Sequence, residues 1–214
     1  MESTEKATQT EVKVEETSTP VVESEIKAEE TSAPIVQIEE IADNDDKAKE
    51  ESVGEKSNMV DDVKYQENTL VLEKFDNEIA NEIGTIIAEL AKERNHVVTV
   101  SVRLANGLTV YQRSMNGAIL SGETWLEAKH NTVMTRSIST LGLFASGKTL
   151  ESLKLNGNYT QFGGGFPLKV KNAGIVGSVL VSGLYHVDDH NLIIEGLNAY
   201  LGTDVPLINE DNYK

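Results

Sequence analysis

Acidic residues are crowded into the first 62 positions of this 214-residue chain. Residues 1–62 hold 19 Asp or Glu against 6 Lys, a net charge of −13, whereas residues 63–214 carry a net charge of only −3. The first segment has no aromatic residue and few bulky apolar ones. It cannot bury enough apolar surface to offset roughly 1–2 kcal/mol of backbone entropy per ordered residue. The sequence therefore predicts a disordered acidic tail over residues 1–62 and one folded domain over residues 63–214.

The tail contains a degenerate repeat. Residues 15–22 (EETSTPVV) recur 14 positions later as residues 29–36 (EETSAPIV). Two polar copies are too few for a stacked repeat architecture. They favour a duplicated solubilising spacer, and the alternative is a pair of short docking sites for a protein partner.

Composition excludes several kinds of site. The chain has no cysteine, which excludes disulfides, thiol catalysis and thiolate metal ligands. It begins with a polar, acidic stretch typical of neither a secretory signal nor a transit peptide, and no apolar run approaches 18 residues. We therefore expect a cytoplasmic protein without membrane insertion. Because the domain has no basic stripe interleaved with aromatic residues, nucleic-acid binding is not expected.

Hydrophobic spacing predicts a helix and then a hairpin in the first half of the domain. Apolar residues recur every three or four positions from Glu67, which predicts one helix ending near Arg94; they are Leu72, Phe75, Ile79, Ile83, Ile86 and Leu90. Valines then alternate with polar residues from Val98 to Val102. Asn106-Gly107 supplies the two positive-φ positions of a tight hairpin turn.

The second half predicts two helices, two strands and a last helix. Their expected positions are 122–139, a short helix after Thr149 capped by its hydroxyl, 166–170, 175–181, and from Asp188 or Asp189 to about Tyr200. Gly202 is suited to end the last helix. The order αββααββα indicates an α+β fold, with an antiparallel sheet flanked by helices rather than a parallel nucleotide-binding sheet.

Residues 142–149, GLFASGKT, match the G-x-x-x-x-G-K-T pattern of phosphate-binding loops. Such a loop needs a buried strand before it and a helix after it. The residues before Gly142 are too polar for a buried strand, and the 65 residues after Thr149 are too few to complete the alternating sheet. We interpret the match as accidental.

Two imidazoles and two carboxylates fall within five residues at His186-Val187-Asp188-Asp189-His190. These groups could ligate a divalent metal, or an imidazole could be an axial ligand of haem iron. The alternative is structural, since Asp188 and Asp189 stand where a helix favours a cap and negative charge. Spacing favours the structural reading, because the two histidines need not share one helical face.

A run of three glycines lies at Phe162-Gly163-Gly164-Gly165-Phe166-Pro167. Glycines permit positive φ and the close approach of another backbone or of a ligand, so a tight turn and a ligand loop both remain open. Trp125, the only tryptophan, belongs to a helical apolar pattern and is predicted in the core. His130 is interpreted as a surface residue.

These segments together resemble one known family. In order, they are Asn106-Gly107 after a valine-rich strand, Trp125 with Lys129 and Thr132, residues 163–168 (GGGFPL), and residues 181–184 (VSGL) leading to Asp188-Asp189-His190. Over about residues 67–203 the chain resembles the GlcG/HbpS-like haem-degrading-domain family, in the branch with the motifs G-G-S-F-P and S-G-L-P-x-E-D-D-H.

The resemblance implies a profilin-like sandwich, assembly of dimers into larger rings, and haem or another small ligand as the candidate cofactor. The site residues that it implies are Trp125, Lys129, Gly163, Gly164, Gly165, Phe166, Asp189 and His190. Among them His190 is the polar contact expected to be retained. No metal site and no catalytic residue are predicted.

The chain departs from the family pattern at three positions after Trp125, and Tyr185-His186-Val187 also replaces the usual Pro-x-Glu. Ala128 and Thr135 stand where arginines are usual, and Ile138 stands where a histidine is common. These changes weaken a cationic, imidazole-containing site. The principal hypothesis is a homo-oligomer that binds a small ligand such as haem. The alternative is a non-catalytic oligomeric scaffold with an acidic docking tail, linked by family resemblance to delivery of tail-anchored proteins to the endoplasmic reticulum. An enzyme is the weakest hypothesis, because no acid–base pair is evident.

Overall fold

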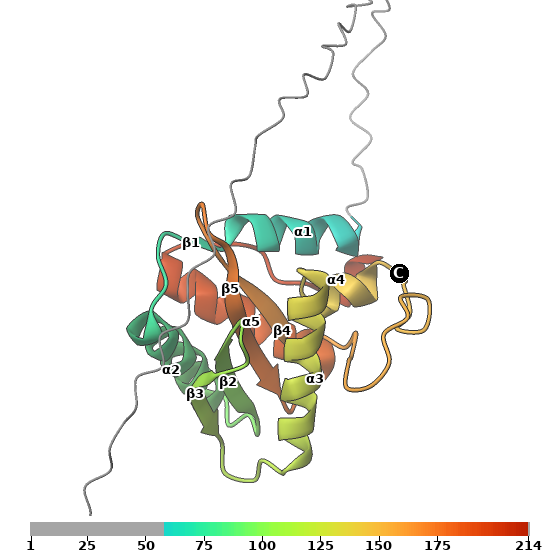
Figure 1. Ribbon diagram of the computed structural model, residues 1–214. Helices are drawn as coiled ribbons and strands as arrows, with labels where there is room; N and C mark the ends of the chain where they lie inside the picture. The colour runs from blue at the N-terminus through green and yellow to red at the C-terminus, as the bar shows by residue number, and fades with distance from the viewer. Residues whose placement is uncertain (1–57, 214) are drawn as a thin grey trace, which may run out of the picture. The chain divides into compact units, whose positions relative to one another are not determined.

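The computed structural model describes residues 58–213 (Figure 1). Apart from its last five residues, the predicted tail therefore lies outside the described residues, as does its repeat. The elements are α1 (Met59–Thr69), β1 (Val71–Leu72), α2 (Asn77–Glu93), β2 (Thr99–Leu104), β3 (Thr109–Ser114), α3 (Ser121–Arg136), α4 (Thr140–Ala145), β4 (Gly165–Val170), β5 (Gly174–Ser182), α5 (His186–Leu201) and a terminal 3₁₀ turn (Glu210–Tyr213). Within residues 58–213, no helix combines the length and the hydropathy needed to cross a membrane.

The five strands form one sheet in the order β1-β4-β5-β2-β3. The pairs β4–β5, β5–β2 and β2–β3 are antiparallel, as the sequence predicts. The short edge strand β1 pairs with β4 in parallel, which corrects the expectation of a purely antiparallel sheet. The predicted α+β class and the order αββααββα are confirmed from α2 onward, with α1 and β1 added before them.

One face of the sheet is apolar and forms the main core with α2 and α5. Its buried side chains include Val100 and Val102 of β2, Val179 and Val181 of β5, Ile83 and Ile87 of α2, and Ile193 and Leu197 of α5. The alternation in β2 places every second residue on this face. Burial of these side chains supplies most of the hydrophobic stabilisation of the fold.

The other face of the sheet is polar and is covered by α3. Thr99, Ser101 and Arg103 of β2 lie there, all buried. Arg103 forms an ion pair with Glu123 of α3, and His130 of α3 shares a 2.9 Å hydrogen bond with Ser178 of β5. The interpretation of His130 as a surface residue is therefore wrong, because only 6% of it is exposed.

Trp125 is not in the core. It remains 44% exposed, whereas Leu126 and Val133 of the same helix are fully buried. Helix α3 packs on a polar sheet face and carries no strong apolar stripe. The spacing of apolar residues around Trp125 therefore does not show which side of α3 is buried. Trp125 lies at the edge of the covered face.

The predicted helix from Glu67 to Arg94 is two helices. The first, α1, begins at Met59, and β1 separates it from α2. Helix α2 begins after Asp76, whose carboxylate accepts a hydrogen bond from the Ile79 N–H at 2.9 Å. This cap lies between Phe75 and Ile79 of the predicted apolar stripe, so a new helix begins there and the stripe does not belong to one continuous helix.

The helix expected after Thr149 lies before it, as α4. Ser139 caps α4 by accepting from the Gly142 N–H at 3.0 Å, while the Thr149 hydroxyl caps only a turn, at the Ser152 N–H. The GLFASGKT segment therefore begins inside a helix and its glycine-lysine end follows that helix. This is the reverse of a phosphate-binding loop and agrees with the interpretation of an accidental match.

Two smaller expectations are corrected. At the β2–β3 turn Gly107 has a φ of 87°, but Asn106 is not among the residues with positive φ. Instead the Asn106 side chain accepts from the Leu108 N–H. Helix α5 begins at His186 after Tyr185, so Asp188 and Asp189 lie in its first turn and neither is the N-cap residue. The predicted end at Gly202 is confirmed, with a φ of 67°.

Helices α2 and α5 approach closely where Gly196 meets Ile87. A Cβ atom added to Gly196 would lie 2.2 Å from Ile87 Cγ1, and both residues are buried. We predict that Gly196→Ala lowers the free energy of unfolding in urea by about 1–3 kcal/mol through overpacking, outweighing a helix-propensity gain of up to about 1 kcal/mol. In Gly196→Ala/Ile87→Ala the loss should be smaller than the sum of the two single losses. If the losses of unfolding free energy in the two single variants add up to the loss in the double variant, the contact between Gly196 and Ile87 is contradicted.

Candidate functional site

A cavity of about 650 Å³ opens beside the start of α3 and the start of α5. Its lining comes from Val97 and Thr99 at the start of β2, the loop before α3 and the first turns of α3, Phe162, residues 182–186 and Asp189. This volume falls in the range of roughly 300–1,000 Å³ found for small-molecule sites. The floor belongs to the polar face of the sheet, through Thr99 and Ser182.

Aromatic rings form one wall of the cavity. The rings of Trp125 and Phe162 meet edge to face with centroids 6.0 Å apart, and Phe162 lies 5.5 Å from the His186 ring. Tyr185 lies 4.6 Å from His186 on another side. Trp125, Phe162 and Tyr185 remain 44%, 44% and 55% exposed, so large apolar surfaces face the opening rather than the core.

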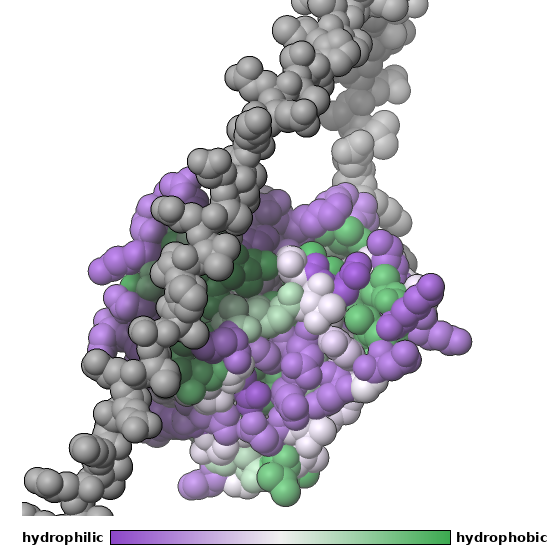
Figure 2. All heavy atoms as spheres, in the orientation of Figure 1, coloured by the Kyte–Doolittle hydropathy of each residue, from purple (hydrophilic) through white to green (hydrophobic). Residues whose placement is uncertain are grey.

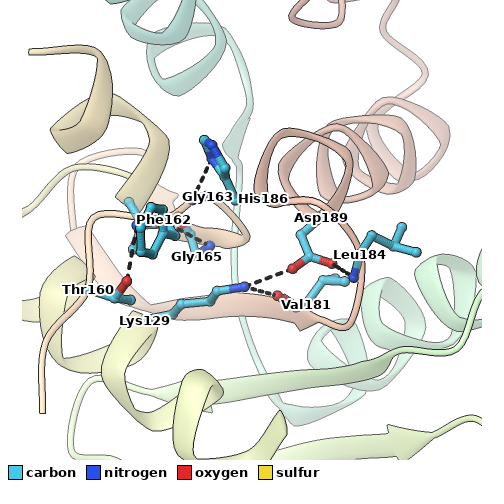
Figure 3. Close-up of polar contacts among 10 residues, drawn as sticks. Lys129, Thr160, Phe162, Gly163, Gly165, Val181, Leu184, His186 and Asp189 are labelled. Atoms are coloured by element: carbon cyan, nitrogen blue, oxygen red, sulfur yellow. Dashed lines mark hydrogen bonds and ion pairs between the residues drawn. The ribbon is translucent and has the colours of Figure 1, made fainter. Parts of the chain in front are cut away.

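A buried ion pair lies at the inner end of the cavity (Figure 3). Lys129 Nζ donates to Asp189 Oδ2 at 2.9 Å and to the Val181 carbonyl oxygen at 2.7 Å. Asp189 Oδ1 accepts from the Leu184 N–H at 2.9 Å. Both charged side chains are only 3% exposed. The pair joins α3, β5 and the first turn of α5.

Burial acts on the two charges in opposite directions. Desolvation lowers the pKa of Lys129, and the negative charge of Asp189 opposes that change. Desolvation likewise raises the pKa of Asp189, opposed by Lys129 and by backbone N–H groups at Leu184 and Gly183. Each charge is therefore retained because its partner is present, as expected for a buried, hydrogen-bonded pair.

The three glycines pack against protein rather than line the cavity. A Cβ atom on Gly163 would lie 2.3 Å from the His186 carbonyl oxygen, and one on Gly164 would lie 2.5 Å from the Val181 carbonyl oxygen and 2.6 Å from Lys129 Nζ. Gly164 also has a φ of 101°. The run therefore lets the backbone pass close to the ion pair and to α5. Gly165 donates its N–H to Thr140 Oγ1 at 3.0 Å.

His186 is the imidazole in the cavity lining. Its Nδ1 accepts a hydrogen bond from the Gly163 N–H at 3.3 Å. Burial is the largest effect on its pKa, which is lowered, so the ring is neutral at pH 7. A neutral imidazole whose Nδ1 accepts a hydrogen bond carries its proton on Nε2.

His190 lies outside the cavity lining and is completely buried. Its Nε2 lies 2.8 Å from Gln66 Oε1, while the Gln66 amide nitrogen donates to the Pro206 carbonyl oxygen at 2.7 Å. Because that oxygen of Gln66 is the acceptor, His190 Nε2–H is the donor. Burial lowers the pKa of His190 to about 3.

The expected site residues thus separate into two groups. Trp125, Lys129 and Asp189 line the cavity. The others lie behind it, packed against protein; they are Gly163, Gly164, Gly165, Phe166 and His190. Among the described residues, no group of three or more His, Asp or Glu side chains is arranged to hold a metal ion, so the His186–His190 segment does not converge on one.

Sequence reasoning missed several lining residues. Phe162 belongs to the glycine motif but is not among the expected site residues, Tyr185 is marked only as a departure from the family motif, and no motif marks Ile119. An exposed aromatic residue beside a glycine run was the available signal for Phe162. Of the departures from the family pattern, Ala128, Thr135 and Ile138 are absent from the lining, whereas Tyr185 and His186 belong to it.

Comparison with known proteins places the domain in a family. Residues 75–198 match the model described as "Haem degrading protein HbpS-like". A UPF0303 protein of Rhizobium rhizogenes is 36% identical over 152 residues, covering 69% of this chain and 93% of that protein. A UPF0303 protein of Yersinia enterocolitica is 34% identical, covering 64% and 84% of the two chains.

Solved structures share the fold. The Ybr137w protein superposes with a TM-score of 0.63 at 21% identity, over 67% of this chain and 87% of that one. The PduOC:Heme complex superposes with a TM-score of 0.51 at 23% identity, over 63% of this chain and 99% of that one.

The buried His190 makes stability depend on pH. Its pKa of about 3 in the folded state lies below the ordinary value of 6.5, so only the unfolded chain gains a proton between these values. We predict that the free energy of unfolding falls as the pH drops below 6.5, by as much as about 1.4 kcal/mol per pH unit from this group. Urea unfolding between about pH 7.5 and 5 measures the slope. The His190→Gln variant should lose the contribution of His190 to this slope. An unchanged slope would contradict the assignment of the pH dependence to His190.

Proposed function

Because the chain belongs to the HbpS-like haem-degrading protein family, we propose that it binds a small, flat, largely apolar molecule in the cavity beside α3 and α5. Haem is the candidate ligand that the family suggests. The observation that carries the proposal is the cavity of about 650 Å³ with Trp125, Phe162 and Tyr185 exposed at its opening. Aromatic side chains left open to water around a cavity are typical of ligand sites.

The cavity walls fit the ring system of haem. The edge-to-face pair of Trp125 and Phe162 offers apolar surface for a flat ligand. The PduOC:Heme complex, which shares the fold at 23% identity, supports haem as the first ligand to test.

The imidazoles do not fit as iron ligands. An axial histidine binds iron through a nitrogen lone pair while its other ring nitrogen usually donates a hydrogen bond. In His186 the Nδ1 lone pair accepts from the Gly163 N–H, so the proton occupies Nε2 and neither nitrogen has a free lone pair. His96, His130 and His190 lie outside the cavity lining. We therefore propose binding through the ring faces and derive no chemistry at the iron.

Binding rather than catalysis is the function that this geometry supports. Lys129 and Asp189, the ionised residues of the lining, are hydrogen-bonded to each other and to backbone groups. Neither is held free to move a proton to or from a ligand.

Haem and iron-free protoporphyrin should bind with the same affinity within about threefold, because the imidazole of the cavity lining offers the iron no free lone pair. Quenching of Trp125, the single tryptophan, reports occupancy at the cavity wall. His186→Ala should change the haem affinity less than threefold, whereas Phe162→Ala should weaken both porphyrins about tenfold, the loss of one buried aromatic contact. A tenfold advantage for haem that His186→Ala removes would overturn the binding mode. No quenching by either porphyrin would count against the haem assignment.

A second candidate function is self-association next to the cavity. The loop between β3 and α3 exposes Ile119 by 73% and Leu120 by 87%. Figure 2 shows hydrophobic surface gathered over this loop, at the bottom of the view. Exposed apolar groups of this kind favour a protein interface, and we propose a second copy of this chain as the partner. Partner binding by the acidic residues 1–62 stays a prediction.

Leu120→Asp should shift the protein from an oligomer to a smaller species, because a carboxylate buried in an apolar interface is left without a partner. Native mass spectrometry at micromolar concentration measures the subunit number. Leu108→Asp is the matched control, since Leu108 is 58% exposed at the β2–β3 turn, outside the cavity lining. Equal masses for wild type and both variants would contradict an interface at this loop.

A further inference from the structure

The charges that line the cavity are already paired with each other. Lys129 is the cation of the lining and Asp189 is the anion, and Nζ lies 2.9 Å from Oδ2. The His186 ring is neutral at pH 7 for the reason given above. The remaining lining residues are apolar, glycine or hydroxyl-bearing. The lining therefore has no net charge and no unpaired charge among the residues that the structure describes.

This arrangement discriminates against a negatively charged ligand. A carboxylate that enters an apolar cavity loses its water, and it regains that free energy only beside a cation or N–H donors that are not already engaged. Any anion near Lys129 Nζ would also lie near the Asp189 carboxylate, which repels it. An uncharged ligand meets neither cost.

The ammonium group of Lys129 can still donate one hydrogen bond. It has three N–H donors, and two are used by the Val181 carbonyl oxygen and Asp189 Oδ2, as Figure 3 shows. Within the described part of the chain no third acceptor is bonded to Nζ, and Lys129 belongs to the cavity lining. A ligand with an acceptor atom at its inner end can fill that position.

From the paired charges, the aromatic wall and the third donor, we infer that the cavity takes an uncharged, flat aromatic molecule with a carbonyl-type acceptor. The ring system lies against Trp125 and Phe162, and the acceptor receives the third N–H of Lys129. The inference names the ligand class for the function proposed above and rests on it. A carboxylate-bearing ligand such as haem would have to keep its acidic groups in water outside the cavity.

Three naphthalenes of the same shape test this class. 2-Naphthamide is neutral and has a carbonyl acceptor, 2-naphthoate is its anionic counterpart, and 2-ethylnaphthalene lacks the acceptor. Titrations at pH 7 follow the indole N–H resonance of Trp125, the single tryptophan at the cavity wall. We expect 2-naphthamide to bind at least tenfold more tightly than 2-naphthoate, and about fivefold more tightly than 2-ethylnaphthalene.

A matched pair of variants tests the cause of the selectivity. Ser121 is exposed and lines the cavity, so Ser121→Arg adds an unpaired cation there. Thr124 is exposed on the same helix but outside the lining, so Thr124→Arg adds the same charge elsewhere. Ser121→Arg should reduce the preference for 2-naphthamide over 2-naphthoate at least fivefold, and Thr124→Arg should leave it unchanged.

The outcomes separate the two proposals. If the amide and the carboxylate bind the wild-type protein equally, the inference about ligand charge is wrong while the binding function stands. Equal binding of the amide and the ethyl compound would remove the role of Lys129 as a donor. If none of the three moves the Trp125 resonance, the inferred ligand class is wrong, and the porphyrin titration decides separately whether the binding function stands.

Discussion

The ion pair between Lys129 and Asp189 is the interaction on which the candidate site depends. It joins the middle of α3 to the first turn of α5, and the same ammonium holds the Val181 carbonyl oxygen of β5. The Asp189 carboxylate also fixes the Leu184 N–H, in the segment that forms one side of the cavity. Because each charge is desolvated, removing either one would leave the other buried without compensation. The pair thereby fixes three walls of the cavity relative to one another.

The sequence around this pair is constrained by space rather than by ligand contact. Gly164 passes so close to Lys129 Nζ and to the Val181 carbonyl oxygen that any side chain would collide with both, and its φ of 101° is itself costly for other residues. A side chain on Gly163 would likewise collide with the His186 carbonyl oxygen. A glycine run next to a cavity therefore does not by itself identify ligand contacts. Here it permits the packing that puts Lys129 and Asp189 at the end of the cavity.

The parts of the fold that follow local rules could be predicted from the sequence. The alternation from Val98 to Val102 and the Asn106-Gly107 turn placed the β2–β3 hairpin, and Gly202 placed the end of α5. The parts that depend on partners far away in the sequence could not be predicted in this way. Trp125 and His130 lie five residues apart on α3, but the sheet face beneath them is polar, so the histidine is buried on Ser178 and the tryptophan is left at the rim. Likewise, the burial of His190 depends on Gln66, which is 124 positions away.

Ala128, Thr135 and Ile138, which depart from the family pattern, lie outside the cavity lining. Ala128 precedes Lys129 on α3 and is 4% exposed, so an arginine there would be a second cation beside an ammonium that already has its carboxylate. Ile138, where a histidine is common, follows the C-cap Ser137, at the opposite end of α3 from the cavity opening. The charges of the cavity lining form one closed pair, Lys129 with Asp189, and under the proposed function such a pair beside aromatic rings selects ligands by shape and by a single hydrogen bond.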